Sequence, residues 1–263
     1  MDNALITSNL LSSVGIEATD GSTVSNNTLI GPKGLGIRLN SIDDDPLTVS
    51  GNTIMDKPGI GLSIQGSGNV TISNNTIADS VNGTGISVTG TSGVQIDING
   101  NRIHRNSESS TIGTCTSSGT CTGSALHIGL GASSTIQYNS ITGSAGTTLV
   151  NVSVVNEDPN FTNNNMVIGS EDYLVYTLTS YGSDDSINLQ SNWWGTTDTT
   201  NLDALIYDWN DNATRQQVNY TPLLTAPNTT TPPSPPTNVA VQTGPTTIAL
   251  TWDANPESDI TGY

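Results

Sequence analysis

The chain has 263 residues, of which 33% are hydrophobic and 5% aromatic, and its 23 acidic residues far outnumber its 6 lysines and arginines. The net charge of −17 repels nucleic acid and anionic lipid, and no apolar run is long enough for membrane insertion, so neither is an expected partner. So few apolar residues would make a poor globular core of this size, yet small aliphatic side chains can fill a narrow column.

One asparagine recurs along residues 4–195 at intervals of 25, 23, 26, 38, 26 and 27 residues. A unit of this length is too short for a domain and must stack on its neighbours to bury its apolar side. Each unit carries short alternating runs, such as 61–64 and 70–72, which predict strands that are apolar on one face. Asparagine suits the corner because it tolerates left-handed backbone angles and its amide can bond to stacked copies. The predicted corner ladder consists of Asn27, Asn52, Asn75, Asn101, Asn139, Asn165 and Asn192.

The repeated pattern Gly-Ile-X-Ile followed by Val-X-Ile-X-Asn-Asn-Thr-Ile resembles the right-handed parallel β-helix superfamily, which includes pectate lyases and polygalacturonases. The resemblance implies an all-β, single-stranded, right-handed parallel β-helix (a solenoid) over residues 1–195. It also implies an extracellular or cell-surface location. It says little about activity, because enzymes, adhesins and structural proteins share this architecture.

In β-helix polysaccharide enzymes the groove follows the outward positions of the first sheet, which are here Glu17, Arg38, Ser63, Ser87 and His127. Glu17 and Arg38 are expected one rung, ~4.8 Å, apart and can pair. Arg38 and His127 are expected three rungs, or ~14 Å, apart, which is too far for joint catalysis. His127 is interpreted as an exposed strand residue.

An acidic cluster, Asp43, Asp44 and Asp45, follows one of these strands and lies near Glu17. Glycosidases need two carboxylates ~5 to 9.5 Å apart, and calcium binds carboxylate oxygens, so the cluster is a candidate for either role. A solvated turn before Pro46 is the simpler alternative. The candidate catalytic residues are therefore Glu17, Arg38, Asp43, Asp44, His104 and His127.

The one long interval of the repeat contains Cys115 and Cys121, separated by "TSSGT". Two interpretations remain open: a disulfide that pins a loop in an oxidising compartment, or two free thiols. His104, at the start of this loop, is either a proton carrier or an exposed loop histidine. With two histidines in the chain, neither a histidine-based zinc site nor a Ser-His-acid triad is expected.

Residues 196–225 break the repeat and predict a cap over the end of the coil. Thr200 or Asn201 is expected to cap a short helix with an apolar face, Trp193, Trp194 and Trp209 complete the lid, and residues 218–220 form a closing strand. Residues 208–212 place oxygen atoms at alternate positions, which is a second candidate for calcium; an asparagine-rich turn is the alternative. The candidate calcium ligands are Asp43, Asp44, Asp45, Asp208, Asn210 and Asn212, and no other cofactor is indicated.

Residues 226–236 contain five prolines, which predict a stiff polyproline-like spacer that does not fold back. Residues 237–263 resemble the beginning of a fibronectin type III domain, with strands at 239–241 and 248–252. Such a domain takes ~100 residues, so further domains of a longer parent chain are expected.

Two functions from different classes are compatible with these features. The first is a non-catalytic extracellular scaffold that binds polysaccharide or another surface component. The second is a polysaccharide lyase or glycoside hydrolase with its groove on the first sheet. The serines in the middle of that groove and the scarcity of cations favour the first.

Overall fold

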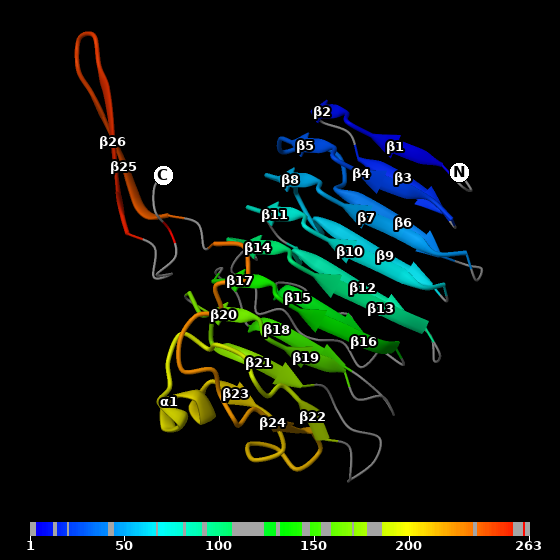
Figure 1. The fold of residues 1–263 in the computed structure, drawn as a ribbon, viewed down its shortest axis with the longest axis vertical. Helices are drawn as coiled ribbons and strands as arrows, with labels where there is room; N and C mark the ends of the chain where they lie inside the picture. Colours follow the sequence, from blue (N-terminus) through cyan, green and yellow to red (C-terminus); the bar gives the residue numbers. More distant parts are fainter. Residues whose placement is uncertain are drawn as a thin grey trace.

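A computed structural model describes residues 4–12, 15–19, 21–41, 45–66, 68–80, 83–90, 94–106, 124–129, 132–143, 148–153, 159–169, 171–177, 186–233, 236–254 and 260. These residues form a stack of coils in which each turn of the chain contributes one strand to each of three parallel sheets (Figure 1). The fold is the predicted right-handed parallel β-helix.

The three sheets are named here A, B and C in the order in which the chain first enters them. Sheet A contains β1 (Leu5–Thr7), β4 (Thr23–Ser25), β7 (Leu47–Ser50), β10 (Val70–Ser73), β13 (Val94–Asn99), β16 (Ala132–Gln137) and β19 (Asn160–Thr162). Sheet B contains β2 (Leu10–Ser12), β5 (Thr28–Ile30), β8 (Thr53–Met55), β11 (Thr76–Ala78), β14 (Arg102–His104), β17 (Ser140–Thr142) and β20 (Asn165–Val167). Sheet C contains β3 (Ile16–Thr19), β6 (Ile37–Ser41), β9 (Leu62–Gly66), β12 (Ile86–Gly90), β15 (Ser124–Gly129), β18 (Thr148–Ser153), β21 (Tyr173–Thr177) and β23 (Ile206–Tyr207).

Alternation along each strand directs one side chain in two into a single apolar column. In sheet A, Val24, Val49 and Ile72 occupy the same inward position on successive strands, and all three are fully buried. In sheet B, Leu29, Ile54 and Ile77 do the same. Burial of small aliphatic side chains in register, rung after rung, is the main apolar stabilisation of the coil.

The corner between sheets A and B carries the asparagine ladder. Each ladder side chain donates from Nδ2 to Oδ1 of the next asparagine, over distances of 2.8 to 3.0 Å. Every Oδ1 beyond Asn9 also accepts the backbone N–H of the asparagine before it. The ladder consists of Asn9, Asn27, Asn52, Asn75, Asn101, Asn139, Asn164 and Asn192.

Asn164 therefore replaces the predicted Asn165, and Asn9 is an additional member at the N-terminal end. The reason lies in the backbone: the residue before each ladder asparagine, not the asparagine itself, has a positive φ. Asn163 has φ 62°, so in the run of three asparagines the second one enters the ladder. Asn165 is instead the first residue of β20.

The cap covers the last coil, at the end opposite the N-terminus in Figure 1. Helix α1 (Thr199–Ala204) is capped by Asp198, whose carboxylate accepts from the N–H groups of Thr200 and Asn201; the prediction of Thr200 or Asn201 as the cap was wrong by two to three residues. Strand β22 (Ser186–Asn188) pairs in parallel with β24 (Gln217–Asn219). Trp194 is buried, whereas Trp209 is 40% exposed, so Trp209 does not belong to the apolar lid.

The proline-rich segment folds back on the coil, contrary to the prediction of a free spacer. Asn228 bonds to Asn163 and Asn165, and the carbonyl oxygen of Pro233 accepts from Arg102. Beyond it, β25 (Thr237–Thr243) and β26 (Ile248–Asp253) form an antiparallel hairpin at the two predicted strand positions. The apolar side chains of the hairpin are exposed, so it adds nothing to the core of the coil.

Candidate functional site

The outer face of sheet C is the candidate site, because the strand register brings the predicted groove residues into one column. Glu17 lies beside Arg38 in the strand register, and Arg38 lies beside Ser63. Ser87 and His127 follow at the same position on the next two strands. The column then continues beyond the predicted residues through Asn151, Tyr176 and Tyr207. Its order is acid, base, two serines, imidazole, amide and two phenols.

The two ends of this column are chemically different. At the first end Glu17 and Arg38 are neighbours, but they form no ion pair with each other. Three rungs, ~14 Å, separate Arg38 from His127. Joint proton transfer between Arg38 and His127 is therefore excluded by distance, and Glu17 and Arg38 are the one adjacent acid and base among the described residues of this column.

His127 is buried, which corrects the expectation of an exposed strand residue. Its Nδ1 lies 2.8 Å from Oδ1 of Asn151, the next residue in the column, and Asn151 in turn donates to the carbonyl oxygen of Tyr176. The imidazole is thus held in place by a neighbouring strand. It connects the serine section of the column to the tyrosine section.

A cluster of three tyrosines and one arginine occupies the far end of sheet C. The rings of Tyr176 and Tyr207 are nearly parallel with centroids 5.0 Å apart, and Tyr173 lies 5.9 Å and 5.2 Å from them. The guanidinium carbon of Arg215 lies 4.1 Å and 4.6 Å from the Tyr176 and Tyr207 centroids. Arg215 also donates to the Tyr176 hydroxyl at 2.6 Å and to the Thr177 carbonyl oxygen. All four side chains are half-buried, so part of the aromatic surface remains accessible.

Sequence reasoning missed this tyrosine cluster. The one local signal was the pair of tyrosines in "YLVY" at 173–176. Tyr207 and Arg215 join them only because β23 pairs with β21 and the loop after β23 returns across the same face. The cluster is a product of the last coil and its cap together.

His104 lies on sheet B and is buried, so the interpretation as an exposed loop histidine was wrong. Burial is the main cause that lowers the pKa of His104 to about 4; the positive charge of Arg105 lowers it further, Asp79 raises it, and Arg102 has the smallest, lowering effect. Arg105 is held by a two-pronged ion pair with Asp79, at 2.8 Å for both contacts. His104 is therefore neutral at physiological pH. It belongs to sheet B, whereas His127 belongs to sheet C.

Of the residues proposed for calcium, Asp208 and Asn212 use their side-chain oxygens for hydrogen bonds within the cap. Both carboxylate oxygens of Asp208 accept backbone N–H groups, from Asn210 and from Val218. Oδ1 of Asn212 accepts from the backbone N–H and the hydroxyl of Thr214. These bonds describe an asparagine-rich turn that ties the cap together. Asp45 is exposed, while Asp43, Asp44, Cys115 and Cys121 lie outside the described residues, so the acidic cluster and the disulfide stay predictions.

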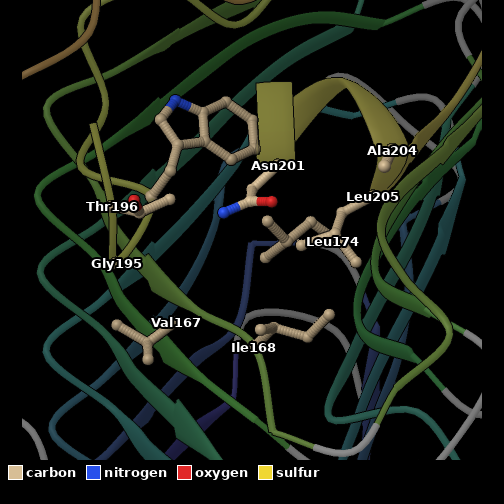
Figure 2. A pocket seen from close by; sticks show the side chains of 9 residues that line it. Val167, Ile168, Leu174, Gly195, Thr196, Asn201, Ala204 and Leu205 are labelled. Atoms are coloured by element: carbon tan, nitrogen blue, oxygen red, sulfur yellow. The ribbon is translucent and has the colours of Figure 1, made fainter. Parts of the chain in front are cut away.

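A pocket of about 420 Å³ lies between α1 and the last coils. Figure 2 shows the Asn201 amide of α1 pointing into it beside Leu174 and Leu205. Its volume is within the usual range for small-molecule sites, ~300 to 1,000 Å³. The lining is uncharged, so the pocket offers no group for acid-base chemistry.

These features define a class of protein: a right-handed parallel β-helix with a polar and aromatic outer face. A comparison with protein families finds that residues 1–116 match a family described as "Periplasmic copper-binding protein (NosD)". The chain is similar to that family over this part of its length. Neither the curated proteins nor the solved structures that were searched contain a match. Within the described residues, no helix is long and apolar enough to span a bilayer.

The described residues do not fit a copper centre. Copper favours imidazole, thiolate and thioether ligands, but His104 and His127 lie on different sheets, and Nδ1 of His127 is already engaged by Asn151. Met55 is two strands from His104 in the same outward column, which is ~10 Å. Over the part of the chain that the structure describes, no three His, Cys, Asp or Glu side chains gather as metal ligands.

Proposed function

We propose that this chain is a rigid, non-catalytic scaffold of the cell exterior or periplasm that binds polysaccharide, or another component of the cell surface, along the outer face of sheet C. The observation that supports it best is the half-buried tyrosine cluster at one end of a column that also presents the half-buried hydroxyl groups of Ser63 and Ser87. Aromatic rings stack on the apolar faces of sugar rings, and hydroxyl and amide groups exchange hydrogen bonds with sugar hydroxyls.

The architecture suits a scaffold because it is stiff and repetitive. Successive rungs present equivalent outward positions ~4.8 Å apart, so an extended polymer can meet several of them along the coil. The similarity of residues 1–116 to a periplasmic family and the acidic, weakly charged surface support a location outside the cytoplasm. The copper in the family description is not carried over, since the described ligands do not converge.

The alternative, a polysaccharide lyase or glycoside hydrolase, has less support. Its acid and base would have to come from the first end of the column, where Glu17 and Arg38 are adjacent strand residues. A β-eliminating or hydrolytic site needs a second acid or base across the sugar from the first. Along the described column the next titratable side chain after Arg38 is His127, which is buried and three rungs away.

The proposal is tested with a panel of neutral and acidic polysaccharides and three variants. Retention of the wild-type protein on one glycan is expected, with at least tenfold weaker binding by Tyr176→Ala. Tyr176→Phe keeps the ring and is expected to bind within a few-fold of the wild type. Tyr138→Ala, which removes a tyrosine from the corner between sheets A and B, is the matched control. Absence of retention on every glycan, or equal binding by Tyr176→Ala, would contradict the proposal, and new reducing ends or unsaturated uronate would favour the enzyme.

A further inference from the structure

The proline-rich segment 227–233, named the strap from here on, is bonded to the corner between sheets A and B. The Asn165 side chain donates to the Asn228 carbonyl oxygen at 3.0 Å and to the Thr231 hydroxyl at 2.6 Å. Its Oδ1 accepts the backbone N–H of Asn228 at 2.7 Å. The Asn228 amide donates to the Asn163 carbonyl oxygen at 2.9 Å. The side chain of Asn165 in the coil therefore has hydrogen-bond partners in the strap for both its N–H groups and its oxygen.

The strap runs backward along the stack, away from the cap and toward the N-terminal coils. Its first contact is with β20 and its last is Arg102 of β14, whose Nε donates to the Pro233 carbonyl oxygen at 2.9 Å. The two strands are two rungs, ~10 Å, apart. Two extended residues from Thr231 to Pro233 cover ~6 Å, and the long Arg102 side chain spans the rest. In Figure 1 this orange segment leaves the capped end and passes beside β20 toward the hairpin.

The outward side chains of sheet B are more deeply buried next to the strap than farther from it. Thr28 and Thr53, on the outward column of sheet B, are half-buried. The same column is fully buried at Ser140 and Asn165, next to the strap. Pro232 also closes one side of a pocket of about 220 Å³ against residues 74–76, Gly100 and Arg102. The strap thus covers a continuous track of the corner instead of touching it at one point.

Its composition makes docking inexpensive in conformational entropy. Proline fixes φ, so a proline-rich segment loses less freedom on ordering than an ordinary chain. Proline lacks the N–H donor but keeps its carbonyl acceptor, and Arg102 donates to that of Pro233. Asn165 donates to the carbonyl oxygen of Asn228 in the same segment. Asn228 fixes the turn into the strap, because its Oδ1 accepts the N–H of Thr230.

We propose that the strap stays docked in solution and acts as a directional connector. It makes the chain double back along the coil, so that the β25–β26 hairpin and anything joined to it leave beside the middle coils and not beyond the cap. The corner track is accordingly a binding surface for an extended, proline-rich segment of the chain itself. This inference is independent of the glycan proposal, which concerns sheet C.

The test uses the full chain labelled with ¹⁵N. A docked strap is expected to give order parameters near the rigid value of ~0.85 for Asn228 to Thr231, where a free linker falls below ~0.6. The backbone N–H of Asn228 is expected to exchange with solvent far more slowly than the backbone N–H of Thr229, because it donates to Oδ1 of Asn165. Nuclear Overhauser contacts between the Pro232 ring and Arg102 would establish the backward direction.

Asn165→Ala removes all three bonds that the Asn165 side chain makes to the strap, and the strap residues are expected to become as mobile as a free linker. Asn228→Ala removes only the side-chain bonds to the Asn163 carbonyl oxygen and the Thr230 N–H, so it is expected to loosen the strap less than Asn165→Ala. Thr229→Ala, at an exposed neighbouring position, is the matched control and is expected to leave the strap rigid. Order parameters below ~0.6 in the wild-type strap, or an equally rigid strap in Asn165→Ala, would overturn the proposal.

Discussion

Replacing Asn101 by alanine is expected to destabilise the coil by about 4 kcal/mol. Asn101 is fully buried in the middle of the ladder, where its Nδ2 donates to Ile72 and Asn139 and its Oδ1 accepts two bonds from Asn75. Each of these four bonds, at 2.9 to 3.0 Å, contributes about 1 kcal/mol net. Alanine also leaves the Asn75 N–H without its acceptor on Asn101.

Urea unfolding measures this change as a shift of the midpoint at constant slope. Asn99→Ala is the matched control, because Asn99 belongs to the same rung but is exposed at the end of β13; it is expected to change stability by less than about 0.5 kcal/mol. Asn9→Ala, at the terminal member of the ladder, is expected to have a smaller effect than Asn101→Ala because Asn9 has a ladder partner on one side only.

The measurement also reports on how the coils cooperate. In a solenoid each repeat is stabilised by its neighbours, so a break in the middle of the ladder can separate unfolding into two steps. If Asn101→Ala and Asn99→Ala unfold at the same urea concentration, the buried amides are not the corner interaction that stabilises the stack. The explanation of the repeat would then have to rest on apolar burial alone.

Three further predictions concern buried and titratable groups. Lys57 is fully buried, its Nζ has no hydrogen-bond partner among the described residues, and burial lowers its pKa from 10.5 despite the nearby Asp56. Lys57→Met is therefore expected to raise the melting temperature at pH 7, and this gain should shrink as the pH approaches 10.5. A gain in melting temperature that does not depend on pH would refute the argument. The pKa of His104 is lowered to about 4, so between pH 6.5 and 4 the unfolded chain binds a proton that the folded chain does not, and the protein loses stability as the pH falls through this range. His104→Gln should lose less stability than the wild type between pH 7 and pH 4.5, measured as the urea midpoint at each pH. An equal fall of the midpoint in both proteins would contradict the burial argument. Replacing His104 and His127 together by glutamine is expected to leave any copper affinity unchanged in calorimetric titration, whereas a tenfold loss would indicate a joint site.

Local patterns in the sequence were sufficient for the repeat, because each coil encodes its own corner and its own inward positions. The recurrence of Asn27, Asn52 and Asn75 predicts stacked turns without any knowledge of distant residues. The same reasoning chose the wrong residue, Asn165, at 163–165, where three asparagines are consecutive and the second one, Asn164, belongs to the ladder. There the positive φ of Asn163 selected Asn164 for the ladder.

The outward column of sheet C was also predictable as far as His127, since strict stacking fixes which residues become neighbours. Whether those residues are accessible was not predictable. His127 and His104 were both expected to be exposed, and both are buried. Alternation along a strand tells which way a side chain points, but exposure depends on what else packs over it.

The sequence by itself determined the periodic part of this protein: short strands that are apolar on one face, an apolar interior and an amide at each corner, because these follow from spacing within about 25 residues. Only the tertiary structure decided which surfaces are assembled or covered. Tyr176 meets Arg215 through the cap, and Asn165 meets Asn228 through the strap, across 39 and 63 residues of chain. Such contacts depend on where the non-repeating segments return to the coil, and no local period encodes that path.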